Sequence, residues 1–175
     1  MRILWVTRSF LDYRIPVYKE LKVKSDGNFK IIFNSDYVPN SVVKKAQKTL
    51  GDSCIGLNGE ITIGYKDTTI LNANAGLRIP FQPKLIKIIK SYKPHVIISD
   101  GFFQWTYAAL WMRFFYDIPH VMCYERTMHT ERNAQWYRKF YRKFVSKWID
   151  AICCSGIESA EYVRSLNFEK HITQG

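Results

Sequence analysis

The chain has 175 residues, of which 47% are hydrophobic and 23% are charged, and its formal net charge is +11. This length predicts a single domain, and the hydrophobic fraction is high enough for a core, which argues against an intrinsically disordered chain. No apolar run reaches the roughly 18 residues of a membrane-spanning helix, and the N-terminus lacks the pattern of a signal peptide, so we expect a soluble, cytoplasmic protein. The positive charge suits a nucleic acid, a membrane surface or a phosphorylated ligand, and an ordinary basic surface explains it equally well.

The start of the chain has the pattern of a βαβ unit. Residues 2–7 form a short apolar run, which is typical of a buried parallel strand. Pro16 suits the first turn of a helix that continues through Leu21, and residues 29–33 predict a second strand. Strand, helix and strand thus follow one another within about 30 residues, as this unit requires.

Residues 34–76 are less regular. The dipeptide Asn58-Gly59 lies between two short segments, residues 52–57 and 60–63, and predicts that they pair as a β-hairpin. The asparagines and glycine within residues 72–76 predict a loop.

Strands and helices alternate in the remainder of the chain. The predicted strands are residues 95–99, 119–124 and 151–154, with a last one beginning at 172–173. The predicted helices run from Pro83 to Pro94, from Trp105 to Phe115, from Asn133 to Trp148 and from Ser155 to about Leu166. We expect the second of these helices to be largely buried, Asn133 to cap the third, and Ser155 with Glu158 to form a capping box. The alternation predicts an α/β domain with a Rossmann-like parallel sheet and helices on both faces.

Ligands of open α/β sheets bind at the carboxyl ends of the strands, so the polar residues that follow each predicted strand are the candidate binding residues. We expect them to lie along one edge of the sheet, in a common cleft. They are Arg8, Asp12, Arg14, Asp100, Gly101, Glu125, Arg126, His129 and Ser155.

The segment from Glu125 to Arg132 is the densest polar cluster. Glu125 can act as a base or bind sugar hydroxyls, Arg126 can hold a phosphate oxygen in a forked hydrogen bond, and His129 can transfer a proton near neutral pH. The alternative is a charged surface loop whose Glu131 favours the following helix N-terminus. Because the segment follows a strand, we favour catalytic roles for His129 and Glu125 and leave both interpretations open for Arg126.

The other candidates also have ordinary structural explanations. Arg8 and Arg14 can be anion ligands or solvated loop residues, and Asp12 can cap the first helix. Asp100 and Gly101 can form a simple turn, and Ser155 is more typical of a cap.

The helix from 134 to 148 has an aromatic stripe and a basic stripe. We interpret it as an amphipathic helix that covers the sheet, with its basic stripe available to lipid headgroups. An interfacial helix on an anionic membrane has the same composition, and binding of single-stranded nucleic acid is the least favoured alternative. The membrane-facing candidates are Arg138, Arg142 and Lys143.

Cysteine spacing argues against a metal site. The four cysteines contain no C-x-x-C pair, so ligands at zinc spacing are missing and no metal is expected.

Three parts of the chain together resemble the N-terminal domain of glycosyltransferase family 4, whose members have the GT-B fold. They are MRILWVT with FLDYRIPVYKEL, KPHVIISDGFFQW with YDIPHVMCYERTMHTER, and WIDAICCSGIESAEYVRSLNFEKHITQG. The resemblance covers nearly the whole chain in order. It implies that residues 1–175 are one acceptor-side domain and that the reading frame continues past Gly175 into a second domain.

The resemblance also implies an activity. Family members transfer a sugar, here expected to be hexosyl, from a nucleotide-sugar to a glycan or lipid-linked acceptor with retention of configuration, and they generally need no metal or other cofactor. The C-terminal domain, which holds the nucleotide and a pair of glutamates, is missing here, so we expect this chain alone to be inactive. Many members carry a glycine pair after the first strand, where this chain has Ser9-Phe10-Leu11, and many place a histidine after the fifth core strand, for which His129 is the candidate. By analogy, the expected setting is polysaccharide assembly in the cytoplasm or on the inner face of the plasma membrane, with no nucleic acid involved.

Overall fold

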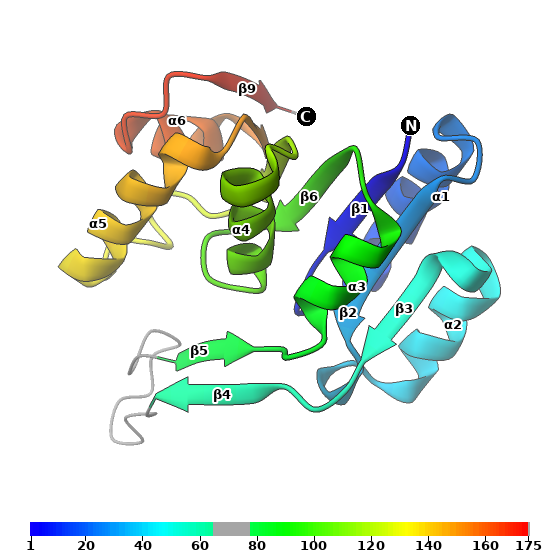
Figure 1. Cartoon of the computed structure of the whole chain (residues 1–175). Coiled ribbons are helices and arrows are strands. Elements are labelled where there is room, and N and C mark those ends of the chain that lie inside the picture. The colour runs from blue at the N-terminus through cyan, green and yellow to red at the C-terminus, as the bar shows by residue number, and fades with distance from the viewer. Residues whose placement is uncertain (65–77, 175) are drawn as a thin grey trace.

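The computed structural model describes residues 1–64 and 78–174, and within them seven strands form one sheet in the order β3-β2-β1-β6-β7-β8-β9 (Figure 1). Every neighbouring pair in this sheet is parallel. The strands are β1 (Ile3–Val6), β2 (Phe29–Asn34), β3 (Cys54–Leu57), β6 (Val96–Asp100), β7 (His120–Tyr124), β8 (Ala151–Cys154) and β9 (His171–Gln174).

Six α-helices among the described residues connect these strands. They are α1 (Ile15–Lys24), α2 (Asn40–Leu50), α3 (Leu85–Tyr92), α4 (Thr106–Tyr116), α5 (Trp136–Val145) and α6 (Ile157–Ser165). The chain moves outward from β1 to β3, then crosses back to β6 and continues to β9. Because parallel crossovers are right-handed, this reversal places the first two helices on one face of the sheet and the other four on the opposite face.

Packing on the two faces follows from the alternation of side chains along each strand. Trp5 and Ile31 point to α1 and α2, whereas Leu4 and Ile32 point to α3 and α4, which pass in front of the sheet in Figure 1. Further along the sheet, Met122 belongs to the cluster covered by α5 and α6. The predicted Rossmann-like α/β fold, with helices on both faces, is therefore confirmed.

The predicted hairpin around Asn58-Gly59 is wrong. The first segment is β3, which pairs with β2, and the second is β4 (Ile61–Gly64), which pairs antiparallel with β5 (Arg78–Phe81) in a separate ribbon. Gly59 has a positive φ of +78°, and the chain there leaves the large sheet for the β4–β5 ribbon. Pairing with β2 places Leu57 in the core of the α3–α4 face, where its side chain is buried. The loop predicted within 72–76 lies outside the described residues.

Helix α2 was not predicted. Its buried side is small, with Ala46 and Leu50 as its buried residues, and lysines occupy much of the rest. Gly51 ends the helix with φ +57° and ψ −134°, a backbone conformation that glycine allows and L side chains rarely adopt.

Two predicted caps are also wrong. Helix α5 begins at Trp136 with Gln135 as its N-cap, so Asn133 lies before the helix. Helix α6 begins at Ile157 with Gly156 as its N-cap, and the Ser155 hydroxyl lies 3.3 Å from the hydroxyl of Ser159 instead of closing a capping box.

The expectation that α4 is largely buried holds for only one side of the helix. Ala108, Ala109 and Met112 pack on the sheet, whereas Trp111 and its neighbours at 114–116 are exposed.

Candidate functional site

A cleft of about 320 Å³ opens at the carboxyl ends of β1, β6 and β7. These three strands lie side by side at the point where the direction of the chain across the sheet reverses, which is the usual ligand site of open α/β sheets. Six of the nine candidate binding residues line the cleft: Arg8, Arg14, Asp100, Gly101, Glu125 and Arg126.

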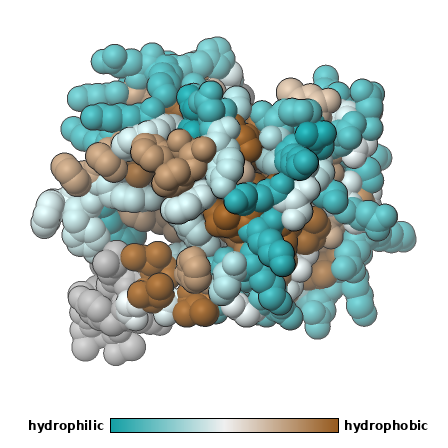
Figure 2. All heavy atoms as spheres, in the orientation of Figure 1, coloured by the Kyte–Doolittle hydropathy of each residue, from teal (hydrophilic) through white to brown (hydrophobic). Residues whose placement is uncertain are grey.

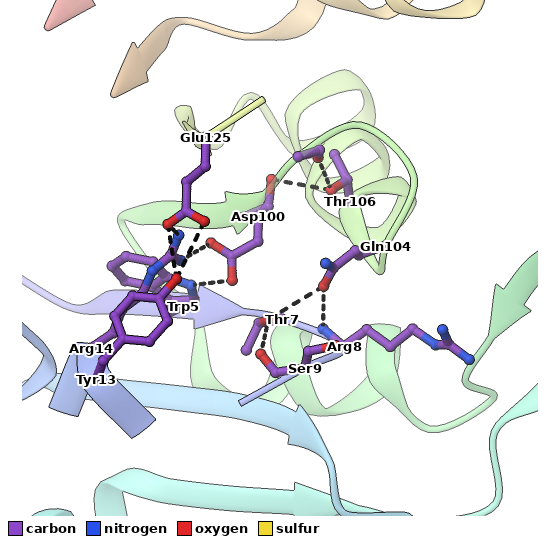
Figure 3. A network of polar contacts seen from close by, with 12 residues as sticks. Trp5, Thr7, Arg8, Ser9, Tyr13, Arg14, Asp100, Gln104, Thr106 and Glu125 are labelled. Carbon is purple, nitrogen blue, oxygen red and sulfur yellow. Dashed lines mark hydrogen bonds and ion pairs between the residues drawn. The ribbon is translucent and has the colours of Figure 1, made fainter. Parts of the chain in front are cut away.

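Arg14 is the centre of the polar network in the cleft (Figure 3). It lies on the short 3-10 turn Asp12–Arg14, which brings its buried side chain over the ends of the strands. Its Nη1 donates to Asp100 Oδ1 at 2.5 Å, and its Nη2 donates to Glu125 Oε1. One guanidinium thus joins carboxylates at the carboxyl ends of two neighbouring strands, β6 and β7.

Further donors hold both carboxylates. The indole of Trp5 donates to Asp100 Oδ2 at 3.3 Å, and the Tyr13 hydroxyl donates to Glu125 Oε1 at 3.1 Å. Asp100 is buried, whereas the side chain of Glu125 is 44% exposed. Glu125 is therefore the carboxylate of this network that a ligand can reach.

Burial and charge act in opposite directions on this network. Burial raises the pKa of Asp100, and the nearby Arg14 only partly offsets it. Burial by itself lowers the pKa of Arg14, but the carboxylates of Asp100 and Glu125 outweigh it and raise that pKa above its usual value. Arg14 is consequently a permanent cation that fixes the geometry of both acids.

Arg8 occupies the other side of the cleft. Its Nε and Nη2 both bind the carboxylate of Glu60, at 2.8–3.0 Å, and Glu60 also accepts a 2.8 Å hydrogen bond from the indole of Trp105. Above the guanidinium lies the ring of Tyr37, 4.4 Å away. This forked ion pair ties the loop after β1 to the residue just before the β4–β5 ribbon.

The segment Ser9-Phe10-Leu11, which stands where many family members are expected to have a glycine pair, is anchored in the core. Phe10 is buried, and its ring lies 5.0 Å from Phe33 and 5.4 Å from Tyr18. Gln104 accepts a 3.1 Å hydrogen bond from the backbone N–H of Arg8.

Glu131 joins two arginines at the α5 side of the cleft. It accepts from Arg126 at 2.8 Å and from Arg142 at 2.6 Å, and Arg142 also donates to the Tyr162 hydroxyl. Glu131 is buried, so its predicted role as a solvated charge near a helix N-terminus is replaced by a structural one. Two guanidiniums share one carboxylate, which leaves this side of the cleft positive.

The described lining of the cleft does not include three of the candidate residues, Asp12, His129 and Ser155. Asp12 is exposed and pairs with Lys45 at 3.4 Å, so it does not cap a helix with its side chain. His129 is exposed on the turn after β7, with both ring nitrogens 3.4 Å from Arg132. Ser155 is exposed, and its backbone N–H donates to the carbonyl of Tyr124.

The three membrane-facing candidates lie in three different environments. Arg142 is 2% exposed and holds Glu131, so the prediction that it faces a membrane is wrong. Arg138 lines the cleft, 5.2 Å from the ring of Phe103, and Lys143 is exposed.

The sequence analysis did not identify two residues that hold this site, Glu60 and Gln104, and it assigned a different role to Glu131. Glu60 and Gln104 follow no parallel strand directly, so the rule that selected the other candidates does not reach them. The role of Glu131 could not be predicted, because nothing in the neighbouring sequence indicates that it is buried.

A family model described as Glycosyltransferase Family 4 matches residues 34–173, which are 140 of the 175 residues. The chain belongs to this family. No curated protein sequence matches it significantly. For this family 4 domain, similar solved structures include MurG of Acinetobacter baumannii, with a TM-score of 0.49 and 8% identity over 90% of this chain. They also include an uncharacterized sugar kinase, PH1459, of Pyrococcus horikoshii, with a TM-score of 0.43 and 8% identity over 95% of this chain.

The family 4 domain spans 41% of the MurG chain and 69% of the sugar kinase chain. Within the described part of the domain, we find no helix with both the length and the apolar character to cross a bilayer.

Proposed function

We propose that this chain is the acceptor-binding domain, and the N-terminal half, of a GT-B glycosyltransferase. The complete enzyme would transfer a hexosyl group from a nucleotide-sugar to a glycan or lipid-linked acceptor with retention of configuration. Family membership supports transferase chemistry. The observation that carries the assignment of the acceptor site is the Arg14–Asp100–Glu125 network, which presents one reachable carboxylate at the switch point of the sheet.

In this proposal Glu125 binds the acceptor. Arg14 and Tyr13 hold its carboxylate from one side, and its exposed side accepts hydrogen bonds from the hydroxyls of the acceptor sugar. Arg126, half-exposed on the positive side of the cleft, would contact a phosphate of a lipid-linked acceptor. Arg8 and Gly101 complete the walls of the cleft.

The catalytic role of His129 stands on the family resemblance alone, because its side chain lies outside the described cleft lining. The expected result for His129→Ala in the full-length enzyme is a strong loss of kcat. Near-normal turnover removes His129 from the proposal and leaves Glu125 as the remaining candidate.

In this proposal the binding site for the nucleotide-sugar donor lies in a second domain. We propose that this domain binds the nucleotide-sugar, that no metal or other cofactor takes part, and that the chain alone has negligible turnover. Calorimetric titration of UDP- and GDP-sugars into the isolated chain should give no measurable heat of binding. Tight binding would contradict this division of labour between the domains.

The test of the acceptor site uses the full-length enzyme with phosphoryl-polyprenol and free oligosaccharide acceptors. Glu125→Gln keeps the shape of the side chain but loses its charge, and it should raise the acceptor KM or lower kcat by about 10-fold or more, since hydrogen bonds to a charged group contribute about 1.5–3 kcal/mol. The donor KM should stay unchanged. Asp12→Asn, on an exposed side chain paired with Lys45, is the matched control and should leave both constants unchanged.

The expected location is the cytoplasm, with peripheral contact at the inner face of the plasma membrane. The alternative function, a non-catalytic basic module that uses the 134–148 helix, loses one of its three proposed cations because Arg142 is buried.

A further inference from the structure

We propose that the outer face of α4 and α5 docks the protein on an anionic lipid bilayer. This inference rests on the peripheral membrane contact proposed above and assigns it to a surface, and it does not depend on the acceptor-binding role of Glu125. It rests on five aromatic side chains, here called the aromatic patch, and on the lysines beside them. The patch consists of Trp111, Phe114, Phe115, Phe144 and Trp148.

The aromatic patch is one continuous surface. Trp111 contacts Phe115 with ring centroids 4.3 Å apart, and Phe115 contacts Phe114 at 4.9 Å. Trp148 then bridges the two helices, since it lies 5.9 Å from Phe114 and 4.9 Å from Phe144. Figure 2 shows the corresponding band of apolar side chains across α4 and α5, next to hydrophilic ones.

The fold does not use these rings as its core. Helix α4 already packs on the sheet through Ala108, Ala109 and Met112, on its other side. Phe114 is 61% exposed and Phe144 is 50% exposed, although phenylalanine is among the residues most often buried. A contiguous apolar surface of this kind marks an interaction site.

The charged residues on α3, α4 and α5 indicate that the partner of the aromatic patch is anionic. Helices α3, α4 and α5 contain no aspartate or glutamate at all, while α5 presents exposed Lys139 and Lys143 on the same helix as Phe144. On α3, Lys90 lies 4.9 Å over the ring of Tyr116, the last residue of α4. The two aspartates that follow these elements, Asp117 after α4 and Asp150 after Trp148, are both paired with Arg113. Aromatic rings with exposed lysines on the same helices match the headgroup region of an anionic bilayer, where rings enter the interface and lysines meet lipid phosphates.

The docking surface and the acceptor cleft share α5. Arg138 of this helix lines the cleft, whereas Lys139 and Lys143, on the same helix as Phe144, are exposed. Docking would therefore place one wall of the cleft close to the lipid headgroups.

The experiment is co-flotation of the chain with phosphatidylglycerol–phosphatidylcholine vesicles and with pure phosphatidylcholine vesicles. The parent chain should bind the anionic vesicles and bind the neutral ones much more weakly. Lys139→Glu with Lys143→Glu should lower the partition coefficient by about 30-fold or more, since each lysine near an anionic surface contributes about fivefold. The control is Lys44→Glu with Lys48→Glu, an exposed pair with the same spacing on α2, and it should lower binding far less.

A second pair of variants tests the rings. Phe114→Ser with Phe115→Ser should lower binding to anionic vesicles by at least 10-fold, and Val17→Ser with Val23→Ser, at exposed apolar positions on α1, should not. All four replaced side chains are exposed, so circular dichroism melts close to that of the parent will show that the fold is intact.

Three outcomes overturn the proposal. The first is equal loss of binding in the α2 and α5 lysine variants, which would indicate diffuse attraction to the net charge. The second is a concentration-dependent dimer that Phe114→Ser with Phe115→Ser abolishes while vesicle binding is absent, which would assign the patch to a second copy. The third is binding of an oligonucleotide in place of vesicles. Turnover of the full-length enzyme on a short water-soluble acceptor should be unchanged in the patch variants, so failure here is distinguishable from failure of the proposed acceptor site.

Discussion

Glu131 provides the sharpest test of how the cleft is held together. Its carboxylate is buried between Arg142, which is 2% exposed, and Arg126, whose side chain is 55% exposed. Glu131→Gln removes the only carboxylate that the described structure pairs with Arg142 and leaves a charged guanidinium in the interior. Breaking a buried ion pair from one side costs about 3–5 kcal/mol, and we expect a loss of this size in the free energy of unfolding.

The matched variant is Arg126→Gln, which leaves the buried pair intact and removes only the half-exposed cation. Such pairs contribute about 0–1 kcal/mol, so this variant should be at least 2 kcal/mol more stable than Glu131→Gln. The double variant Glu131→Gln with Arg142→Met removes both buried charges and should recover most of the loss. Urea unfolding of the four proteins measures these differences. The reasoning fails if Glu131→Gln costs no more than Arg126→Gln, because the burial of Arg142 would then have no energetic consequence.

Three further predictions concern single residues. Burial lowers the pKa of His120 from 6.5 to about 4, so the folded state holds this residue neutral while the unfolded state takes up a proton below about pH 6.5. The resulting stability is fully present above pH 6.5 and is lost as the pH falls toward 4, by about 3 kcal/mol in total at ~1.36 kcal/mol per pH unit. His120→Asn should remove this part of the acid dependence in urea titrations, and an unchanged slope would contradict it. Gly101→Ala should cost about 1 kcal/mol in urea unfolding, because φ is +62° while space for a Cβ is open. Its crystal structure should keep the cleft, and a stability equal to the parent would refute the backbone argument. Arg8→Met should destabilise the protein by about 1–3 kcal/mol, because Glu60, 1% exposed, keeps only the indole of Trp105 as a described partner. An unchanged unfolding midpoint would contradict that prediction.

The order of strands and helices could be predicted because it depends on short-range patterns. The apolar runs that became β1, β2, β6, β7 and β8 are each bounded by turns or by a helix with one apolar side. Once the sheet is parallel, the carboxyl-end rule brings Arg14, Asp100 and Glu125 to one edge, although 86 residues separate the first two.

Pairing between distant segments could not be predicted in the same way. Asn58-Gly59 lies where the chain leaves β3, but whether β3 pairs with β4 or with β2 depends on β2, a segment distant from this dipeptide in the sequence. The ion pair between Arg8 and Glu60 joins residues 52 positions apart, and no local pattern records that separation.

The sequence by itself determined the α/β class, the parallel character of the sheet and the edge at which polar residues gather, because hydrophobic periodicity and chain connectivity are properties of neighbouring residues. Only the tertiary structure decided which of those polar residues meet, that Arg142 is buried, and that the rings of α4 and α5 face solvent. A periodic stripe shows that a helix has two sides, but the elements packed against that helix determine which side is covered.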